Sequence, residues 1–198
     1  MNTVDVDELR TMVKEMYKAV AQEPDGTFHF EMGRELALRL GYPADDLDRI
    51  PPEAIESFAG VGYHLGLAAL QRGEQVLDLG SGSGTDAFVA AVAVAASGAV
   101  TGVDMTDAQL EKACRLAERD GFLGVRFEKG YIENTPIETS SVDVVISNGV
   151  INLCADKQAV FHEIHRVLKP GGWLQFADIA NGRPVPPEAL RDIDLWTG

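Results

Sequence analysis

The sequence predicts an α/β fold in which a mostly parallel sheet of about five strands follows an N-terminal helical segment. From about residue 75 onward, short runs rich in β-branched residues alternate with helical stretches of about ten to fifteen residues, the pattern of right-handed βαβ crossovers. Before that point, apolar residues recur every three or four positions, as they do in amphipathic helices. We therefore expect a sheet covered by helices on both faces, with a helical segment ahead of it.

The first third of the chain is predicted to be helical and acidic. Residues 4–21 form one amphipathic helix, which the segment Pro-Asp-Gly at residues 24–26 ends. Two more helices are expected at residues 34–40 and 52–57, the second with a proline at its first position, where helices accept one.

The strands of the sheet are predicted from five short apolar runs. They cover residues 76–79, 99–103, 125–127, 142–146 and 173–177. The longest apolar run, residues 87–96, is predicted as a helix packed on the sheet, because a membrane span needs about 20 residues. A short helix is expected at residues 187–196.

Composition places the chain among soluble globular proteins. Its 198 residues suffice for one domain with a core, and 17 basic less 31 acidic side chains give a net charge of −14. This balance disfavours nucleic acid as a partner, since phosphate binding needs clustered Lys and Arg. Acidic residues near the N-terminus argue against a signal peptide, so we expect a cytoplasmic protein without a membrane partner.

The cysteines and histidines suggest no metal site. Cys114 and Cys154 lie forty residues apart with no neighbouring ligand set, and both are predicted to be packed thiols. His162 and His165 lie three positions apart rather than the four of the zinc-binding helix motif, so we expect them to be solvated positions on a helix.

A glycine-rich loop at residues 78–84 follows the first predicted strand and precedes a helix expected to begin near Thr85. Its glycines permit a tight turn and a close approach to a ligand, and the helix start offers free amides. Because ligands of parallel sheets bind at the carboxyl ends of the strands, the loop predicts a nucleotide-like ligand. A tight turn without a ligand is the alternative.

Acidic residues at the ends of the first two strands indicate which ligand. Asp78 favours a cationic group over a pyrophosphate, and Thr85 stands where the dinucleotide fingerprint has glycine, which points away from NAD. Asp104 ends the second strand, where a carboxylate can accept both hydroxyls of a ribose. Capping the next helix is the alternative role for Asp104.

With these residues, the segment 76–84 resembles the first motif of class I S-adenosylmethionine-dependent methyltransferases. The resemblance runs from about residue 58 to the end of the chain. It implies a Rossmann-like methyltransferase sheet over residues 69–198, an N-terminal helical cap over residues 1–68, and S-adenosylmethionine as the cofactor.

The resemblance also implies roles for particular residues. Residues 130–133 resemble the third motif of the family, and residues 147–150 resemble the fourth, which faces the reactive sulfonium. The implied cofactor-binding residues are Asp78, Gly80, Ser81 and Gly82 around the methionine part, Asp104 on the ribose, Met105 and Ile132 against the adenine, Glu133 near the adenine amino group, and Asn148 near the sulfonium.

Within that class, the chain is most similar to arsenite methyltransferases, whose segments recur at residues 102–107, 130–133 and 150–153. The resemblance implies that those enzymes hold arsenic on three cysteine thiolates. Val61 and Gly149 occupy two of the matching positions, and the third would follow Trp196, near the end of the chain. Because arsenic is bound by deprotonated sulfur, and Cys154 lies five positions further on than Gly149, we expect another small-molecule acceptor. Arsenite methylation, or a truncated cofactor-binding module without catalysis, is the alternative.

The expected reaction is an in-line methyl transfer in which the protein positions the reactants and the helical segment excludes water. Gly60, Gly62 and Tyr63 are predicted hinge and lid residues. Tyr63, His64 and His29 are candidate bases, although a packing or surface role suits each of them better. The five predicted strands are fewer than the seven usual in the family, so we expect the last strands to be missing and an exposed edge to favour a homodimer.

Overall fold

The computed structural model describes residues 5–183, 185 and 196, and within them it contains one parallel sheet of five strands. The strands lie in the order β3-β2-β1-β4-β5, so the chain adds β2 and β3 on one side of β1 and then β4 and β5 on the other. In parallel sheets this change of side places a ligand-binding crevice at the carboxyl ends of the two strands where it occurs, here β1 and β4. The strands are β1 Gln75–Leu79, β2 Ala99–Asp104, β3 Val125–Lys129, β4 Val142–Asn148 and β5 Leu168–Ala177.

Helices occupy both the segment before the sheet and the connections between its strands. Those that precede β1 are α1 Val6–Gln22, α2 Gly33–Leu40, α3 Ala44–Leu47, α4 Pro52–Glu56 and α5 Leu65–Ala68. Those that follow are α6 Thr85–Val94, α7 Asp107–Arg119, the 3-10 helix η1 Ile151–Leu153 and α8 Lys157–Val167. The α/β fold is therefore as the sequence predicts, and α1, α2 and α4 lie where N-terminal helices were predicted, whereas the short helices α3 and α5 were not predicted. None of the helices described is both long and apolar enough to span a bilayer.

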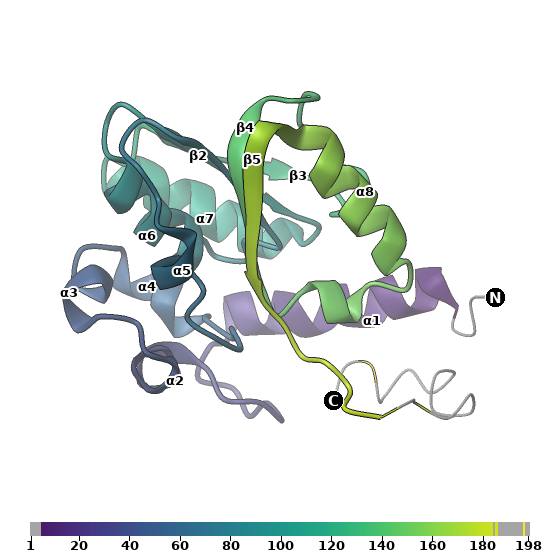
Figure 1. The fold of residues 1–198 in the computed structure, drawn as a ribbon. Coiled ribbons are helices and arrows are strands. Elements are labelled where there is room, and N and C mark those ends of the chain that lie inside the picture. The colour runs from purple at the N-terminus through teal and green to yellow at the C-terminus, as the bar shows by residue number, and fades with distance from the viewer. Residues whose placement is uncertain (1–4, 184, 186–195, 197–198) are drawn as a thin grey trace.

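The helices cover the two faces of the sheet, as Figure 1 shows, with α8 on one side and α6 and α7 on the other. Strand side chains alternate between these faces, as the period of two requires. Val76 packs into the cluster that contains Phe88 of α6, whereas Leu77 packs into the cluster that contains Val160 and Ile164 of α8.

Helix α1 crosses the carboxyl ends of the strands, at the lower end of the sheet in Figure 1. Asp5 caps it, because its side chain accepts hydrogen bonds from two amides of the first turn. Leu9 and Val13 form a small cluster with Met105 and Leu153, which belong to the loops after β2 and β4. The helix therefore covers the edge of the sheet where a ligand is expected.

The predicted strands agree with the observed ones to within two residues, except for β5. This strand begins at Leu168 instead of residue 173, because its register shifts between the pair Val142–Leu168 and the pair Val144–Trp173. The extra residues of β5 between these two pairs bulge out of the regular pairing with β4. Of the helix predicted at residues 187–196, all but the last residue lies outside the described residues.

One prediction about burial on the helices needs correction. Cys114 was expected to be a packed thiol, but it is exposed, because α7 buries Leu110, Ala113 and Leu116 on its inner face and Cys114 lies off that face. Cys154 is half-buried. The prediction for His162 and His165 is confirmed, since both are exposed.

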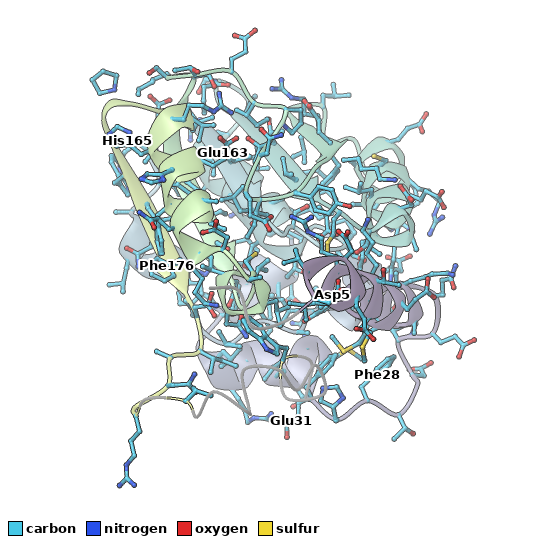
Figure 2. The ribbon with its side chains drawn as sticks, turned by 90° about the vertical axis from the view of Figure 1, so that its right-hand side faces the viewer. Asp5, Phe28, Glu31, Glu163, His165 and Phe176 are labelled. Atoms are coloured by element: carbon cyan, nitrogen blue, oxygen red, sulfur yellow. The ribbon has the colours of Figure 1, made fainter. Side chains whose placement is uncertain are left out.

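Glu163, between these histidines on α8, is buried and links that helix to the segment after β3 (Figure 2). Its Oε1 atom accepts hydrogen bonds from the amide and the hydroxyl of Thr135, each at 2.7 Å. Arg166 donates to the same carboxylate at 2.6 and 2.7 Å. These bonds, with Arg166 first, lower the pKa of Glu163 to about 2.

Candidate active site

A cavity of about 130 Å³ lies at the carboxyl ends of β1, β2 and β4, beneath α1. The nine residues that the sequence predicts for the cofactor all line it: Asp78, Gly80, Ser81, Gly82, Asp104, Met105, Ile132, Glu133 and Asn148. They come from four separate segments of the chain between Asp78 and Asn148, and the parallel topology brings them together.

The glycine-rich loop is tied to the neighbouring strand. The amides of Gly80 and Ser81 both donate to the carbonyl of Val103, at 2.8 and 3.1 Å. Gly80 has φ of +72°, and a Cβ atom at this position would lie 2.4 Å from a methyl group of Val150. Only glycine therefore fits here, where the backbone of the loop approaches the side chain of Val150.

Two polar atoms in the wall of the cavity lack partners. The Oδ2 atom of Asp78 and the hydroxyl of Ser81 are buried, and neither has a hydrogen-bond partner among the described residues. Burial raises the pKa of Asp78 well above its usual value, and the charges of Asp86 and Asp104 raise it further. A buried carboxylate without a hydrogen-bond partner or a neighbouring cation favours a cationic ligand that donates hydrogen bonds. The site therefore fits an ammonium group.

Asp104 closes the loop on the β2 side. Its two oxygens accept from the amides of Gly82 and Thr106, at 3.0 and 2.8 Å. Thr106 is itself the N-cap residue of α7, so the capping role expected as an alternative for Asp104 is not the one that the structure shows. A carboxylate has about four lone-pair positions, which leaves Asp104 able to accept from ribose hydroxyls.

Helix α1 supplies a wall of the cavity that the sequence did not predict residue by residue. Val6, Leu9, Arg10, Val13 and Tyr17 line it. Burial, with the charge of Asp104, raises the pKa of Tyr17 to about 12.

Two basic side chains of α1 bind this wall to the loop after β3, through an ion pair, a cation–π contact and a hydrogen bond. Arg10 pairs with Glu133 at 3.1 Å, and its guanidinium lies 4.4 Å from the ring centre of Tyr131. The Nζ atom of Lys14 donates to the hydroxyl of Tyr131 at 2.9 Å. The amphipathic pattern showed that α1 has a buried face but not what that face covers.

A second group missed from the sequence lies beside Asp78. The carboxylate of Asp86, in the first turn of α6, is buried and lines the cavity. The hydroxyl of Tyr42 donates to it, and so does the Nδ2 atom of Asn148, at 3.1 Å. The acidic residue directly after the glycine loop was the available signal in the sequence.

Asn148 also holds the loop of residues 60–62. Its Oδ1 atom accepts from the amides of Val61 and Gly62, at 2.8 and 3.3 Å. A Cβ atom at Gly60 would lie 2.5 Å from Nδ2 of Asn148, so the loop packs closely on this side chain.

The candidate bases do not line the cavity. Tyr63 packs against the ring of Tyr42, and its pKa is raised mainly by burial. His64 is buried, and His29 is exposed with its ring edge against Phe30. The packing and surface roles that suit these residues better are the ones that the structure shows. Within the described part of the chain, no three His, Cys, Asp or Glu side chains gather as a metal site.

The sequence of residues 70–195 matches the family model of the methyltransferase domain, over more than half of the chain. The chain belongs to this family. The chain is similar to arsenite methyltransferases from Halobacterium salinarum, 38% identical over 98% of this chain, and from Aquipseudomonas alcaligenes, 47% identical over 76% of it. These matches cover 53% and 45% of the relatives, so the chain spans about half the length of the curated relatives it matches.

Solved structures show the same relationship. A crystal structure of an arsenic(III) S-adenosylmethionine methyltransferase from Chlamydomonas reinhardtii superposes with a TM-score of 0.66 at 43% identity, over 73% of this chain and 51% of that one. A methyltransferase from Aquifex aeolicus shares the fold at 22% identity, with a TM-score of 0.56 over 78% of each chain. The predicted Rossmann-like fold and the resemblance to class I methyltransferases of the arsenite type are confirmed.

The chain differs from the arsenite methyltransferases at the two positions where the resemblance places Val61 and Gly149 in place of cysteine. Val61 and Gly149 are neighbours, because a Cβ atom at Gly149 would lie 3.2 Å from a methyl group of Val61. Neither offers a sulfur atom. Cys154 lines the cavity, but burial, with the charge of Glu133, raises the pKa of its thiol to about 12, so the thiol stays protonated at neutral pH.

Proposed function

We propose that this chain binds S-adenosylmethionine in the cavity and transfers its methyl group to a small-molecule acceptor. When bound, the cofactor supplies a methyl group on a positively charged sulfur, which a nucleophile displaces in line. The observation that carries the proposal is the buried, unpartnered Oδ2 atom of Asp78 beside the glycine loop, because it needs a cationic donor to complete its hydrogen bonding.

Each lining group has a task in this proposal. Asp78 and Ser81 hold the methionine end, and the close turn at Gly80 and Gly82 lets the backbone approach it. Asp104 accepts from the ribose. The adenine lies against Met105 and Ile132 with its amino group toward Glu133, and Asn148 lies near the sulfonium.

The walls favour an acceptor that is already nucleophilic. Among the described residues that line the cavity there is neither a histidine nor a lysine, and Tyr17 and Cys154 hold their protons at neutral pH. The chain's own part is then to position the reactants and to exclude water with α1. A thiolate or a carbanion suits this site, since neither requires a base at the moment of transfer.

Arsenite is the second candidate acceptor, and the similarity to arsenite methyltransferases favours it. The apolar pair Val61 and Gly149 and the protonated thiol of Cys154 argue against it, because trivalent arsenic requires thiolates. A cofactor-binding module without catalysis is a third possibility. It differs from the main proposal in binding the cofactor without transferring the methyl group.

Two measurements test these alternatives. Calorimetry with S-adenosylmethionine and S-adenosylhomocysteine is expected to show binding of both, and binding of neither refutes the proposal. A methyl-transfer assay with arsenite is expected to show no product with the wild-type chain. The double variant Val61→Cys with Gly149→Cys is expected to gain arsenite binding, since it places two thiols side by side. Methylation of arsenite by the wild-type chain contradicts our argument from the thiols.

The assembly and location belong to the same proposal. We propose a homodimer, because β5 is an edge strand of the described sheet and carries the exposed Trp173 and Phe176. Light scattering across a concentration series tests it, and a monomer at all concentrations refutes it. The cytoplasmic location, and the division into a cap of residues 1–68 and a core of residues 69–198, stay predictions.

A further inference from the structure

The carboxylates of Asp78 and Asp86 form an acidic pair that has no cationic partner in the described residues. Both side chains are buried in the wall of the cavity, and Asp86 is one of the charges that raise the pKa of Asp78. No ion pair to either carboxylate is found within residues 5–183, 185 and 196. A cation bound beside Asp78 therefore also acts on Asp86.

Asp86 is connected to the far side of the cavity through one side chain. The Nδ2 atom of Asn148 lies within hydrogen-bond distance of three acceptors: Oδ2 of Asp86 at 3.1 Å, the Tyr42 hydroxyl at 3.0 Å and the Gly62 carbonyl at 3.0 Å. An amide nitrogen has only two hydrogens, so these three acceptors compete for them. An ionised carboxylate is the strongest acceptor of the three.

A ligand cation changes the outcome of this competition. A cation beside Asp78 attracts the carboxylate of Asp86, which weakens the hydrogen bond that this carboxylate accepts from Nδ2 of Asn148. The amide hydrogen then turns to the carbonyl of Gly62, while Oδ1 keeps the amides of Val61 and Gly62. The loop of residues 60–62 becomes more firmly held as a result.

We propose that Asp86 is a positioning residue whose bond to Asn148 couples a cationic ligand beside Asp78 to the loop of residues 60–62. This inference rests on the proposed function, in which the cation is the methionine end of the cofactor. Val61 of this loop touches the position of Gly149, beside the expected place of the acceptor. The coupling implies ordered binding, in which the cofactor binds first and completes the acceptor side.

Hydrogen exchange of the amides of Val61 and Gly62 tests the coupling without a known acceptor. S-adenosylhomocysteine carries the ammonium, whereas 5′-methylthioadenosine has the same adenosine without the amino acid part. In the wild-type chain, we expect the first ligand to slow exchange in this loop by roughly two- to tenfold, as one added hydrogen bond would. We expect the second ligand to leave loop exchange unchanged.

The variant Asp86→Asn keeps the shape of the side chain and removes its charge. We expect it to bind S-adenosylhomocysteine without slowing exchange in the loop, whereas the control Asp45→Asn, on the exposed surface of α3, behaves as the wild type. Exchange of the β1 and β2 amides reports whether the variant is folded. If it is not, the wild-type comparison still tests the coupling itself, because equal slowing by the two ligands overturns it.

The outcomes separate the inference from the proposed function. Equal slowing of the loop by the two ligands, or slowing in Asp86→Asn equal to that in the wild type, overturns the inference. Absence of binding by S-adenosylhomocysteine to the wild-type chain overturns the proposed function instead.

Discussion

Replacing Asp78 by asparagine should weaken the binding of the cofactor and at the same time stabilise the ligand-free protein. The substitution removes a buried charge but keeps the size of the side chain. Asp78 lies near the end of β1, directly before the glycine loop, and its Oδ2 atom is unpartnered, so in the absence of a ligand its charge is poorly compensated.

The loss of affinity follows from the bond that the carboxylate is expected to make. A hydrogen bond to a charged group contributes about 1.5 to 3 kcal/mol. Since 1.4 kcal/mol is tenfold in a dissociation constant, calorimetry with S-adenosylhomocysteine should show binding weakened by roughly ten- to 150-fold.

The gain in stability depends on pH. The pKa of Asp78 in the folded protein is raised above its unfolded value of about 3.8, so the folded state binds the additional proton. The wild-type free energy of unfolding should therefore be fully retained below that value and fall as the pH rises toward the folded pKa. Asp78→Asn removes this fall, so at pH 7 its melting temperature should exceed that of the wild type.

The control for this experiment is Asp45→Asn, which removes an exposed carboxylate of α3. Both its affinity and its melting temperature should equal those of the wild type. Unchanged affinity in Asp78→Asn, together with a lower melting temperature, would refute the assignment of Asp78 to the cation.

Two further substitutions test the packing around the site. Gly80→Ala should lose about 2 to 4 kcal/mol of stability in urea unfolding, because it combines a positive φ with a close approach to Val150. Gly121 also has a positive φ, of +74°, but no atom lies within 4 Å of a Cβ added there. Gly121→Ala should therefore lose only about 1 kcal/mol of stability, and an equal loss in the two variants would contradict the close contact at Gly80. The ionised Glu163 side chain should contribute about 2 to 3 kcal/mol to the free energy of unfolding above pH 4.5, and this contribution should be lost as the pH falls through about 2. Glu163→Gln should lack the contribution at every pH. Urea unfolding across this range should show no such change for the exposed Glu111→Gln, and a wild-type curve parallel to that of Glu163→Gln would refute the buried bond.

The sheet and the cavity floor could be predicted from the sequence because their signals are local. Asp78 directly precedes the glycine loop near the end of β1, and Asp104 ends β2, so each can be recognised from its neighbours in the chain. Parallel topology alone then brings Asp78 and Asp104 together. The hydrogen bond between Tyr42 and Asp86 could not be predicted in this way. The two residues lie 44 positions apart, and no repeating pattern in the sequence relates them. The burial of Glu163 likewise depends on Thr135, whose position is set by tertiary packing.

The position of α1 has a consequence for the speed of any reaction in this cavity. If a ligand between the strand ends and this helix leaves only when the helix moves aside, the proposed reaction should be limited by the departure of the demethylated product. Arg10 and Lys14 fasten the helix through partly exposed contacts, which dissolved ions screen within about 8 Å at physiological ionic strength. Moderate salt should therefore shorten the residence time of the product.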